Sequence, residues 1–151
     1  MKIFIAGEFN DFARCIMIRT RVFVVEQNIS AELETDEFEN TSTHYLATDE
    51  GTAVGTARWR LLDYHTAKIE RVAILKEARG NGIGTQLMRC ILDDIHCHPE
   101  IETIKVGSQK AAIPFYQKLG FQIIGQEYLD AEIPHYMMVK SNSEIFNSNV
   151  S

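Results

Sequence analysis

The chain has 151 residues, of which 45% are hydrophobic and 24% are charged, and its formal net charge is −6. This size and composition predict a single globular domain at residues 1–140 with a frayed polar tail at 141–151. The negative charge without a basic stripe argues against nucleic-acid binding, and the lack of a signal peptide or a membrane-length apolar run predicts a cytoplasmic protein with no membrane partner.

The first elements are a strand at residues 2–6 and a helix that follows it. Asn10 or Asp11 is the expected cap of this helix, because short polar side chains accept hydrogen bonds from the first amides. The apolar periodicity ends near Val25, where we expect the helix to end.

Residues 26–43 form a polar stretch that predicts a long surface loop. Five acids within it have no basic neighbour in sequence: Glu32, Glu34, Asp36, Glu37 and Glu39. Such a run is usually a solvated loop. If it borders an acceptor site, its field would instead attract a cationic amine.

Three strands are predicted next, the first two joined by a turn at Asp49-Glu50-Gly51. Their ranges are 45–48, 53–62 and 66–75. In the third strand the inward-facing apolar positions slip by one residue between Glu70 and Val72. A β-bulge would absorb that slip, so we predict one near Arg71 or Val72.

A glycine-rich segment, Arg79-Gly80-Asn81-Gly82-Ile83-Gly84, lies between this strand and an amphipathic helix. Glycines let a backbone approach a ligand, and the free amides at a helix start favour anionic oxygens, so the segment predicts a phosphate cradle. Its GxGxG pattern matches neither GxxxxGK[ST] nor GxGxxG. A turn without a ligand remains the alternative from these residues alone.

The rest of the chain predicts a helix at 111–119 and strands at 102–107, 121–125 and 136–140. The two terminal strands would allow pairing with a second copy, so a homodimer is possible. His96-Cys97-His98 suggests a metal site, but adjacent side chains on a helix point in different directions. We therefore expect no metal.

Two segments resemble known motifs of one enzyme superfamily. Val72-Ala73-Ile74 with the glycine-rich segment looks like the acetyl-CoA motif of the GNAT N-acetyltransferases, whose core is [QR]xxGx[GA]. Residues 112–121 resemble the "FYxKLGF" helix and strand of that superfamily. Residues 22–27 and 129–135 look like its YjcF/ElaA-like branch.

This resemblance implies a mixed α/β fold, with a central, mostly antiparallel sheet, a bulged strand and flanking helices. It also implies acetyl-CoA as cosubstrate: the backbone of the bulged strand would bind the pantetheine arm, and the amides after it the diphosphate, with Arg79 at its entrance. The residues concerned are Val72, Ala73, Ile74, Arg79, Gly80, Asn81, Gly82, Ile83, Gly84 and Thr85. A backbone amide near Ile74 would stabilise the oxyanion.

The implied reaction is direct attack of a primary amine on the thioester. An alkylammonium has a pKa of about 10.4, so a base must remove a proton. We predict Glu70 as this base, with a surface or strand-paired carboxylate as the alternative. Tyr116 matches the general acid that protonates the CoA sulfur, and its alternative role is packing beside Phe115.

His135 is a weaker candidate that would line the acceptor pocket, and His44 is a secondary one; both are residues that neighbours often satisfy. The predicted activity is therefore acetyl-CoA-dependent N-acetylation, with a small cationic metabolite as the expected acceptor. A protein lysine or N-terminus is the alternative acceptor. A CoA-binding sensor without turnover is the alternative function.

Overall fold

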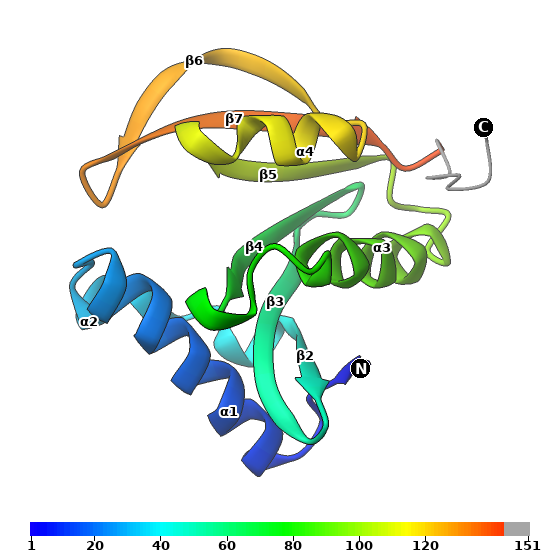
Figure 1. Cartoon of the computed structure of the whole chain (residues 1–151). Helices are drawn as coiled ribbons and strands as arrows, with labels where there is room; N and C mark the ends of the chain where they lie inside the picture. The colour runs from blue at the N-terminus through cyan, green and yellow to red at the C-terminus, as the bar shows by residue number, and fades with distance from the viewer. Residues whose placement is uncertain (144–151) are drawn as a thin grey trace. The chain divides into compact units, whose positions relative to one another are not determined.

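The computed structural model describes residues 1–143, and Figure 1 labels their helices and strands. Seven strands form a sheet in the order β1-β2-β3-β4-β5-β7-β6. The pair β4–β5 is parallel, whereas β1–β2, β2–β3, β5–β7 and β6–β7 are antiparallel. The predicted mixed α/β fold is confirmed.

The chain divides into two compact units, and each is described by itself. The first unit contains Met1–Arg60 and Glu70–Ile91, and the second contains Leu61–Ile69 and the residues from Leu92 onward. The single domain at 1–140 stays a prediction. The last strand ends at Ser141, and residues 144–151 of the expected tail lie outside the described residues.

The first unit is built from a helical N-terminal half and a strand meander. Its elements are β1 (Lys2–Ile5), α1 (Phe9–Arg19), the π-helix η1 (Thr20–Glu26), α2 (Ala31–Glu34), the 3-10 helix η2 (Glu39–Thr41), β2 (Thr43–Asp49), most of β3 (Thr52–Asp63), the end of β4 (Thr66–Ile74), the 3-10 helix η3 (Lys76–Ala78) and most of α3 (Ile83–His96). Its core joins Cys15 and Ile18 of α1 and Val22 of η1 to Leu46 of β2 and Ala73 of β4. Apolar residues three to four apart thus bury one face of the helix.

The helix α1 begins earlier than predicted. Its N-cap is Glu8, so the cap predicted at Asn10 or Asp11 was wrong. Asp11 instead lies in the first turn, where a carboxylate favours the helix dipole. The helical segment continues as η1 to Glu26, one residue beyond the predicted end.

Two local predictions about the strands are confirmed. Glu50 and Gly51 have φ values of 49° and 81°, so the β2–β3 hairpin turns through two left-handed residues. Arg71 has a φ of 56° inside β4, which places an irregularity at the predicted bulge. The parallel pairing of β4 with β5 ends at Ile69.

The second unit contains β5 (Thr103–Gln109), the 3-10 helix η4 (Lys110–Ala112), α4 (Ile113–Lys118), β6 (Gln122–Asp130) and β7 (Ile133–Ser141). Helix α4 packs against β5 (Figure 1). The side-chain amide of Asn142 donates to the carbonyls of Ile95, His98 and Ile101, which fixes the end of β7 to the end of α3.

The strands β6 and β7 are longer than predicted. They meet at Ala131 and Glu132, with φ values of 49° and 64°. A turn of this kind is usually marked by Gly or Asn, and Ala131 and Glu132 stand there instead, so the turn could not be predicted from its residues. Strand β6 lies at one edge of the sheet, and its pairing with a second copy stays a prediction.

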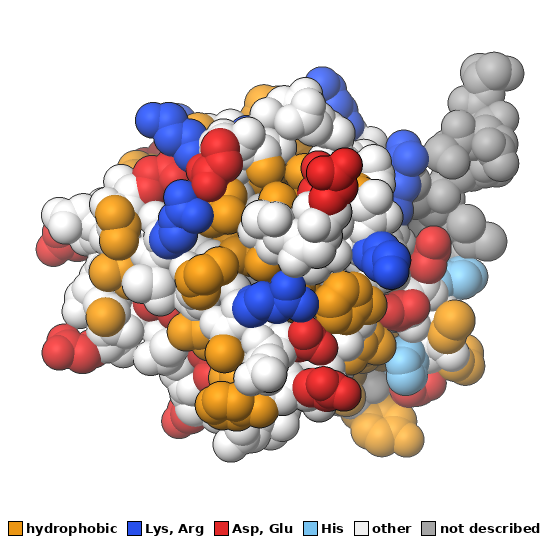
Figure 2. Space-filling model, turned by 60° about the horizontal axis from the view of Figure 1, so that its bottom comes forward, with side chains coloured by type: hydrophobic (Ala, Val, Ile, Leu, Met, Phe, Trp, Pro, Cys, Tyr) orange, Lys and Arg blue, Asp and Glu red, His pale blue; other side chains and the backbone are white. Residues whose placement is uncertain are grey.

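Acidic and basic side chains alternate over the face drawn in Figure 2, with hydrophobic side chains between them. On this face neither sign of charge occupies a broad continuous area. Among the residues described, no helix is both long enough and apolar enough to cross a membrane.

Candidate active site

The glycine-rich segment together with Thr85, here called the glycine loop (residues 79–85), follows η3 and includes the first residues of α3 in the first unit. Gly80 and Gly82 have φ values of 83° and 76°, a region that residues with a Cβ atom rarely adopt. A Cβ built on either glycine would meet no atom within 4 Å, so the space beside the loop is open. The loop therefore has room for a ligand against its backbone.

The loop leads into α3 with backbone donors at its start. The amide of Gln86 donates to the carbonyl of Gly82 at 3.1 Å, so the preceding amides of Ile83, Gly84 and Thr85 have no acceptor within the helix. The side chain of Ile83 is buried with Ala47 and Val54, which anchors this end of the loop. The arrangement suits an anion such as a diphosphate.

Two polar side chains of the loop are held by the protein itself. Asn81 donates to the carbonyls of Ala78 and Arg79 at 3.2 Å and 3.4 Å, so its side chain closes the loop. The guanidinium group of Arg79 donates to both carboxylate oxygens of Glu26, at 2.6 Å and 2.8 Å, and its Nε donates to the carbonyl of Ile74 at 2.9 Å.

The bulge in β4 directs Arg71 away from a regular strand position. Arg71 Nε donates to the carbonyl of Glu34 at 3.0 Å, and Nη2 donates to Asp36 at 3.1 Å. Val72, Ala73 and Ile74 follow directly, and Ala73 is buried in the core. The contacts of Arg71 thus fix the backbone at the start of the predicted pantetheine-binding segment.

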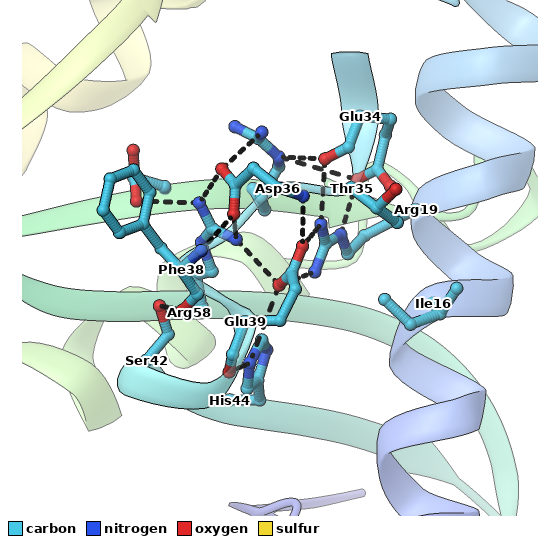
Figure 3. A network of polar contacts seen from close by, with 12 residues as sticks. Ile16, Arg19, Glu34, Thr35, Asp36, Phe38, Glu39, Ser42, His44 and Arg58 are labelled. Carbon is cyan, nitrogen blue, oxygen red and sulfur yellow. Dashed lines mark hydrogen bonds and ion pairs between the residues drawn. The ribbon is translucent and has the colours of Figure 1, made fainter. Parts of the chain in front are cut away.

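Arg71 belongs to a larger cluster, which we call the arginine–carboxylate network (Figure 3). Its members are Arg19, Arg58, Arg60 and Arg71 with Glu34, Asp36, Glu39 and Glu70. Arg58 donates to Asp36, Glu39 and Glu70 at 2.7 to 3.0 Å. Arg19 contacts Glu34 and Glu39. Four positive and four negative groups balance each other.

The predicted loop at 26–43 is therefore corrected in two respects. It contains α2 and η2, and three of its five acids are paired with arginines from α1, β3 and β4. Glu34 is only 3% exposed. Neutralised carboxylates create little field outside the protein, so the expected attraction of a cationic amine by this run is much reduced.

The network holds Asp36, Glu39 and Arg58 in their charged forms. Burial would raise the pKa of Asp36 and Glu39, but hydrogen bonds and ion pairs with Arg58 and Arg19 respectively lower each of them to about 2. Burial would lower the pKa of Arg58, yet its contacts with Asp36, Glu70 and Glu39 raise it above the ordinary value. All three groups stay ionised near neutral pH.

Glu70, the predicted base, is part of this network. One of its oxygens accepts from Arg58 at 3.0 Å and from Arg60 at 2.7 Å. Both arginines belong to β3, so these contacts tie the carboxylate of Glu70 into the arginine–carboxylate network. They favour the alternative of a strand-paired carboxylate, with Arg58 and Arg60 of β3 among its partners.

His44 is also attached to the network. It is 6% exposed, and its Nε2 lies 2.8 Å from the carbonyl of Glu39. Burial lowers the pKa of His44, although the neighbouring carboxylate of Glu39 favours the protonated form. The ring packs edge-on to Phe12. Neighbouring residues thus contact both Nε2 and the ring of His44.

The other two predicted side chains lie in the second unit. Tyr116 is 8% exposed and contacts the rings of Phe115 and Phe121. Burial raises the pKa of Tyr116 well above its ordinary value, so the phenol keeps its proton. His135 Nδ1 lies 2.7 Å from the carbonyl of Ile133, and the ring stacks on Tyr128.

The histidines of the possible metal site have separate protein contacts. His96 Nδ1 lies 2.9 Å from the carbonyl of Asn142, and His98 Nδ1 lies 3.5 Å from Glu100. Cys97 is exposed. Within residues 1–143, no group of three or more His, Cys, Asp or Glu side chains is arranged to hold a metal ion.

Sequence reasoning missed Arg19 and Arg58, the two most buried charged residues within positions 1–143. Arg19 is 1% exposed and Arg58 is 0% exposed. A signal was present in the sequence. Arg19 follows Cys15 by four residues on the buried face of α1, and Arg58 lies in a strand between the apolar residues Ala57 and Trp59. An arginine within an apolar pattern, in a chain with unpaired acids, predicts buried ion pairs.

Comparison with known proteins identifies the family. The acetyltransferase (GNAT) domain family matches residues 15–142, so the chain belongs to the GNAT acetyltransferases. Within that family it belongs to the YjcF/ElaA-like branch. It is 38% identical to the uncharacterized N-acetyltransferase YjcF of Bacillus subtilis over 141 residues, which cover 93% of this chain and 99% of YjcF.

ElaA of Escherichia coli is 30% identical over 128 residues, covering 83% of this chain and 84% of ElaA. The match to the crystal structure of ElaA covers 92% of this chain and 97% of the ElaA chain, with a TM-score of 0.81. A GNAT family acetyltransferase from Elizabethkingia anophelis, solved with acetyl-CoA bound, covers 93% of this chain and 97% of its own, with 16% identity and a TM-score of 0.65. This last likeness shows the fold alone.

Proposed function

We propose that this protein transfers the acetyl group of acetyl-CoA directly to a primary amine. The observation that supports this most strongly is the glycine loop, in which left-handed Gly80 and Gly82 leave open space beside their backbone. The amides from Gly80 to Thr85 would hold the diphosphate, as in the motif that the loop resembles. The backbone of Val72, Ala73 and Ile74 would bind the pantetheine arm.

Tyr116 is proposed as the general acid. A buried phenol that keeps its proton can donate it to the departing CoA sulfur. A thiol has a pKa of about 8.5, below that of the phenol, so the transfer is uphill and is completed when the tyrosinate takes a proton back from solvent. The thioester and the acceptor amine supply the remaining reacting atoms, and no metal enters the proposed reaction.

The role of Glu70 as base stays a prediction, and its arginine contacts support a structural role instead. The pH dependence of Glu70→Gln separates the two roles. Loss of the acidic limb of the kcat/KM profile is expected for a base. A lower unfolding midpoint with an unchanged profile is expected for a structural carboxylate.

A small cationic metabolite remains the proposed acceptor, with a protein lysine or N-terminus as the alternative. The neutralised acids of residues 26–43 remove one argument for a cation. Glu32 and Glu37 are the exposed acids of this run, and they remain available to attract a cationic acceptor. His135 is kept as a weak candidate for the acceptor side.

The test measures CoA release with a thiol reagent over a panel of small amines and peptides. Tyr116→Phe is expected to lower kcat about 100-fold while leaving acetyl-CoA affinity unchanged, because only the phenol proton is removed. Tyr136→Phe removes a hydroxyl elsewhere in the second unit and serves as the control. Tight acetyl-CoA binding without release by any acceptor would favour a CoA-binding sensor.

A further inference from the structure

Glu26 contacts the glycine loop through Arg79, although 53 residues separate the two in sequence. Its carboxylate accepts one hydrogen bond on each oxygen, from Nη1 and from Nη2 of Arg79. This two-bond geometry fixes the plane of the guanidinium group as well as its position. The hydrogen bonds from Arg79 hold the pKa of Glu26 below its ordinary value, so the carboxylate is ionised at neutral pH.

The position of Glu26 depends on an unusual helix. Glu26 is the last residue of η1, a π-helix of seven residues that continues α1. The amide of Gln27 donates to the carbonyl of Val22, five residues earlier, which is the π-helical pattern. Compared with an α-helix, such a segment changes the direction of the side chains that follow, and π-helical turns are frequent at functional sites.

The contacts of Arg79 leave part of its guanidinium group available. A guanidinium group has five N–H donors. Among the described residues, one donor binds the carbonyl of Ile74 and two bind Glu26. Two donors remain, on a side chain that is 40% exposed. They belong to a group whose orientation is already fixed before any ligand arrives.

We propose that Glu26 is a positioning residue for the diphosphate of acetyl-CoA, because it holds Arg79 in an orientation that leaves N–H donors for the ligand. This inference rests on the proposed function. Glu26 does not touch the cosubstrate; it acts by ordering a long, flexible side chain in advance. Ordering before binding lowers the entropy lost when the complex forms.

A nearby ion pair offers a comparison. Arg21 and Glu77 are joined by one hydrogen bond of 3.0 Å, and both are more than half exposed. Glu77 lies in η3, two residues before Arg79 in sequence. Neutralising Glu77 changes the local charge as much as neutralising Glu26, but leaves both hydrogen bonds of the Glu26–Arg79 pair intact.

The test is titration calorimetry of CoA against wild type, Glu26→Gln and the control Glu77→Gln. Glu26→Gln is expected to weaken CoA binding about tenfold, with Glu77→Gln near wild type. Pantetheine, which lacks the diphosphate, is measured as a competitor and should bind all three proteins equally. In an Arg79→Gln background, Glu26→Gln should have no further effect on CoA.

Unchanged or tighter CoA binding by Glu26→Gln overturns the proposal, as does an equal loss for pantetheine. A further loss in the Arg79→Gln background also overturns it, because Glu26 would then act without Arg79. Thermal unfolding of each variant checks that the fold is retained. If wild type itself binds no CoA, the proposed function fails, whereas normal wild-type binding with an unaffected Glu26→Gln removes only the role of Glu26.

Discussion

The arginine–carboxylate network and the glycine loop both lie in the first unit, but they use polar groups in opposite ways. In the network, side-chain charges are buried and paired with each other, and Arg58 is 0% exposed. In the glycine loop, Gly80 and Gly82 are exposed and have open space beside them. The network pairs its own charges, whereas the loop leaves its backbone exposed beside open space.

The bulge at Arg71 connects the two regions. Its side chain joins the network through Asp36, and its backbone precedes Val72 by one residue. A buried ion-pair network tolerates little movement, because a separated buried charge costs free energy. The difference suggests that the network supports the strand from which the loop extends, and the following predictions separate stability from binding.

The largest effect is expected for Arg58→Met. The change leaves three carboxylates without their shared partner, and breaking a buried ion pair costs about 3–5 kcal/mol. The free energy of unfolding, measured with urea, should fall by that amount. CoA affinity of the fraction that remains folded should change much less than stability.

Arg21→Met is the matched control, since it removes an arginine from an exposed ion pair with Glu77. Its unfolding midpoint should remain near wild type, because exposed pairs contribute little. Equal midpoints for Arg58→Met and Arg21→Met would mean that the network does not stabilise the fold.

A second, smaller effect is expected from acid. The pKa of Glu39 is lowered from 4.5 to about 2 in the folded protein, so its contribution is complete above the unfolded value and is lost as the pH falls toward 2. The loss should be about 3 kcal/mol across that window. Urea unfolding at several pH values measures it.

Glu39→Gln tests the assignment of this pH dependence. The amide cannot titrate, so the variant should be less stable at neutral pH and should change less between pH 4.5 and 2 than wild type. An identical pH dependence in both proteins would assign the acid sensitivity to other groups.

The glycine loop could be predicted from sequence because its information is local. Three glycines, a preceding strand and a following amphipathic helix are contiguous, and the torsion angles of Gly80 and Gly82 fit that pattern. An irregularity near Arg71 was predicted from the apolar pattern, and Arg71 has a φ of 56°. The buried positions of β4 are nevertheless Ala67, Ile69 and Ala73, not the predicted Val72 and Ile74.

The network could not be predicted because its partners are distant in sequence. Arg58 and Asp36 are 22 residues apart, and Arg19 and Glu34 are 15 apart. A local scan therefore finds acids without bases in residues 26–43, and only the tertiary fold brings the arginines to them. The same reason explains why Glu70 was predicted as a base without its arginine partners, although β3 supplies Arg58 and Arg60 beside it.

The smallest of these effects on stability is expected for Gly82→Ala. Gly82 has a φ of 76°, and a left-handed conformation costs an L-residue about 1–2 kcal/mol, while the added methyl group meets no atom within 4 Å. Gly7→Ala is the control, because its site is equally open and its φ is not in the left-handed region. A methyl group in the space proposed for the diphosphate should also weaken CoA binding, an effect that Arg58→Met should largely lack. If Gly82→Ala lowers stability but leaves CoA affinity intact, the loop needs its glycine only for the turn. The glycine loop would then no longer differ from the network by binding a ligand.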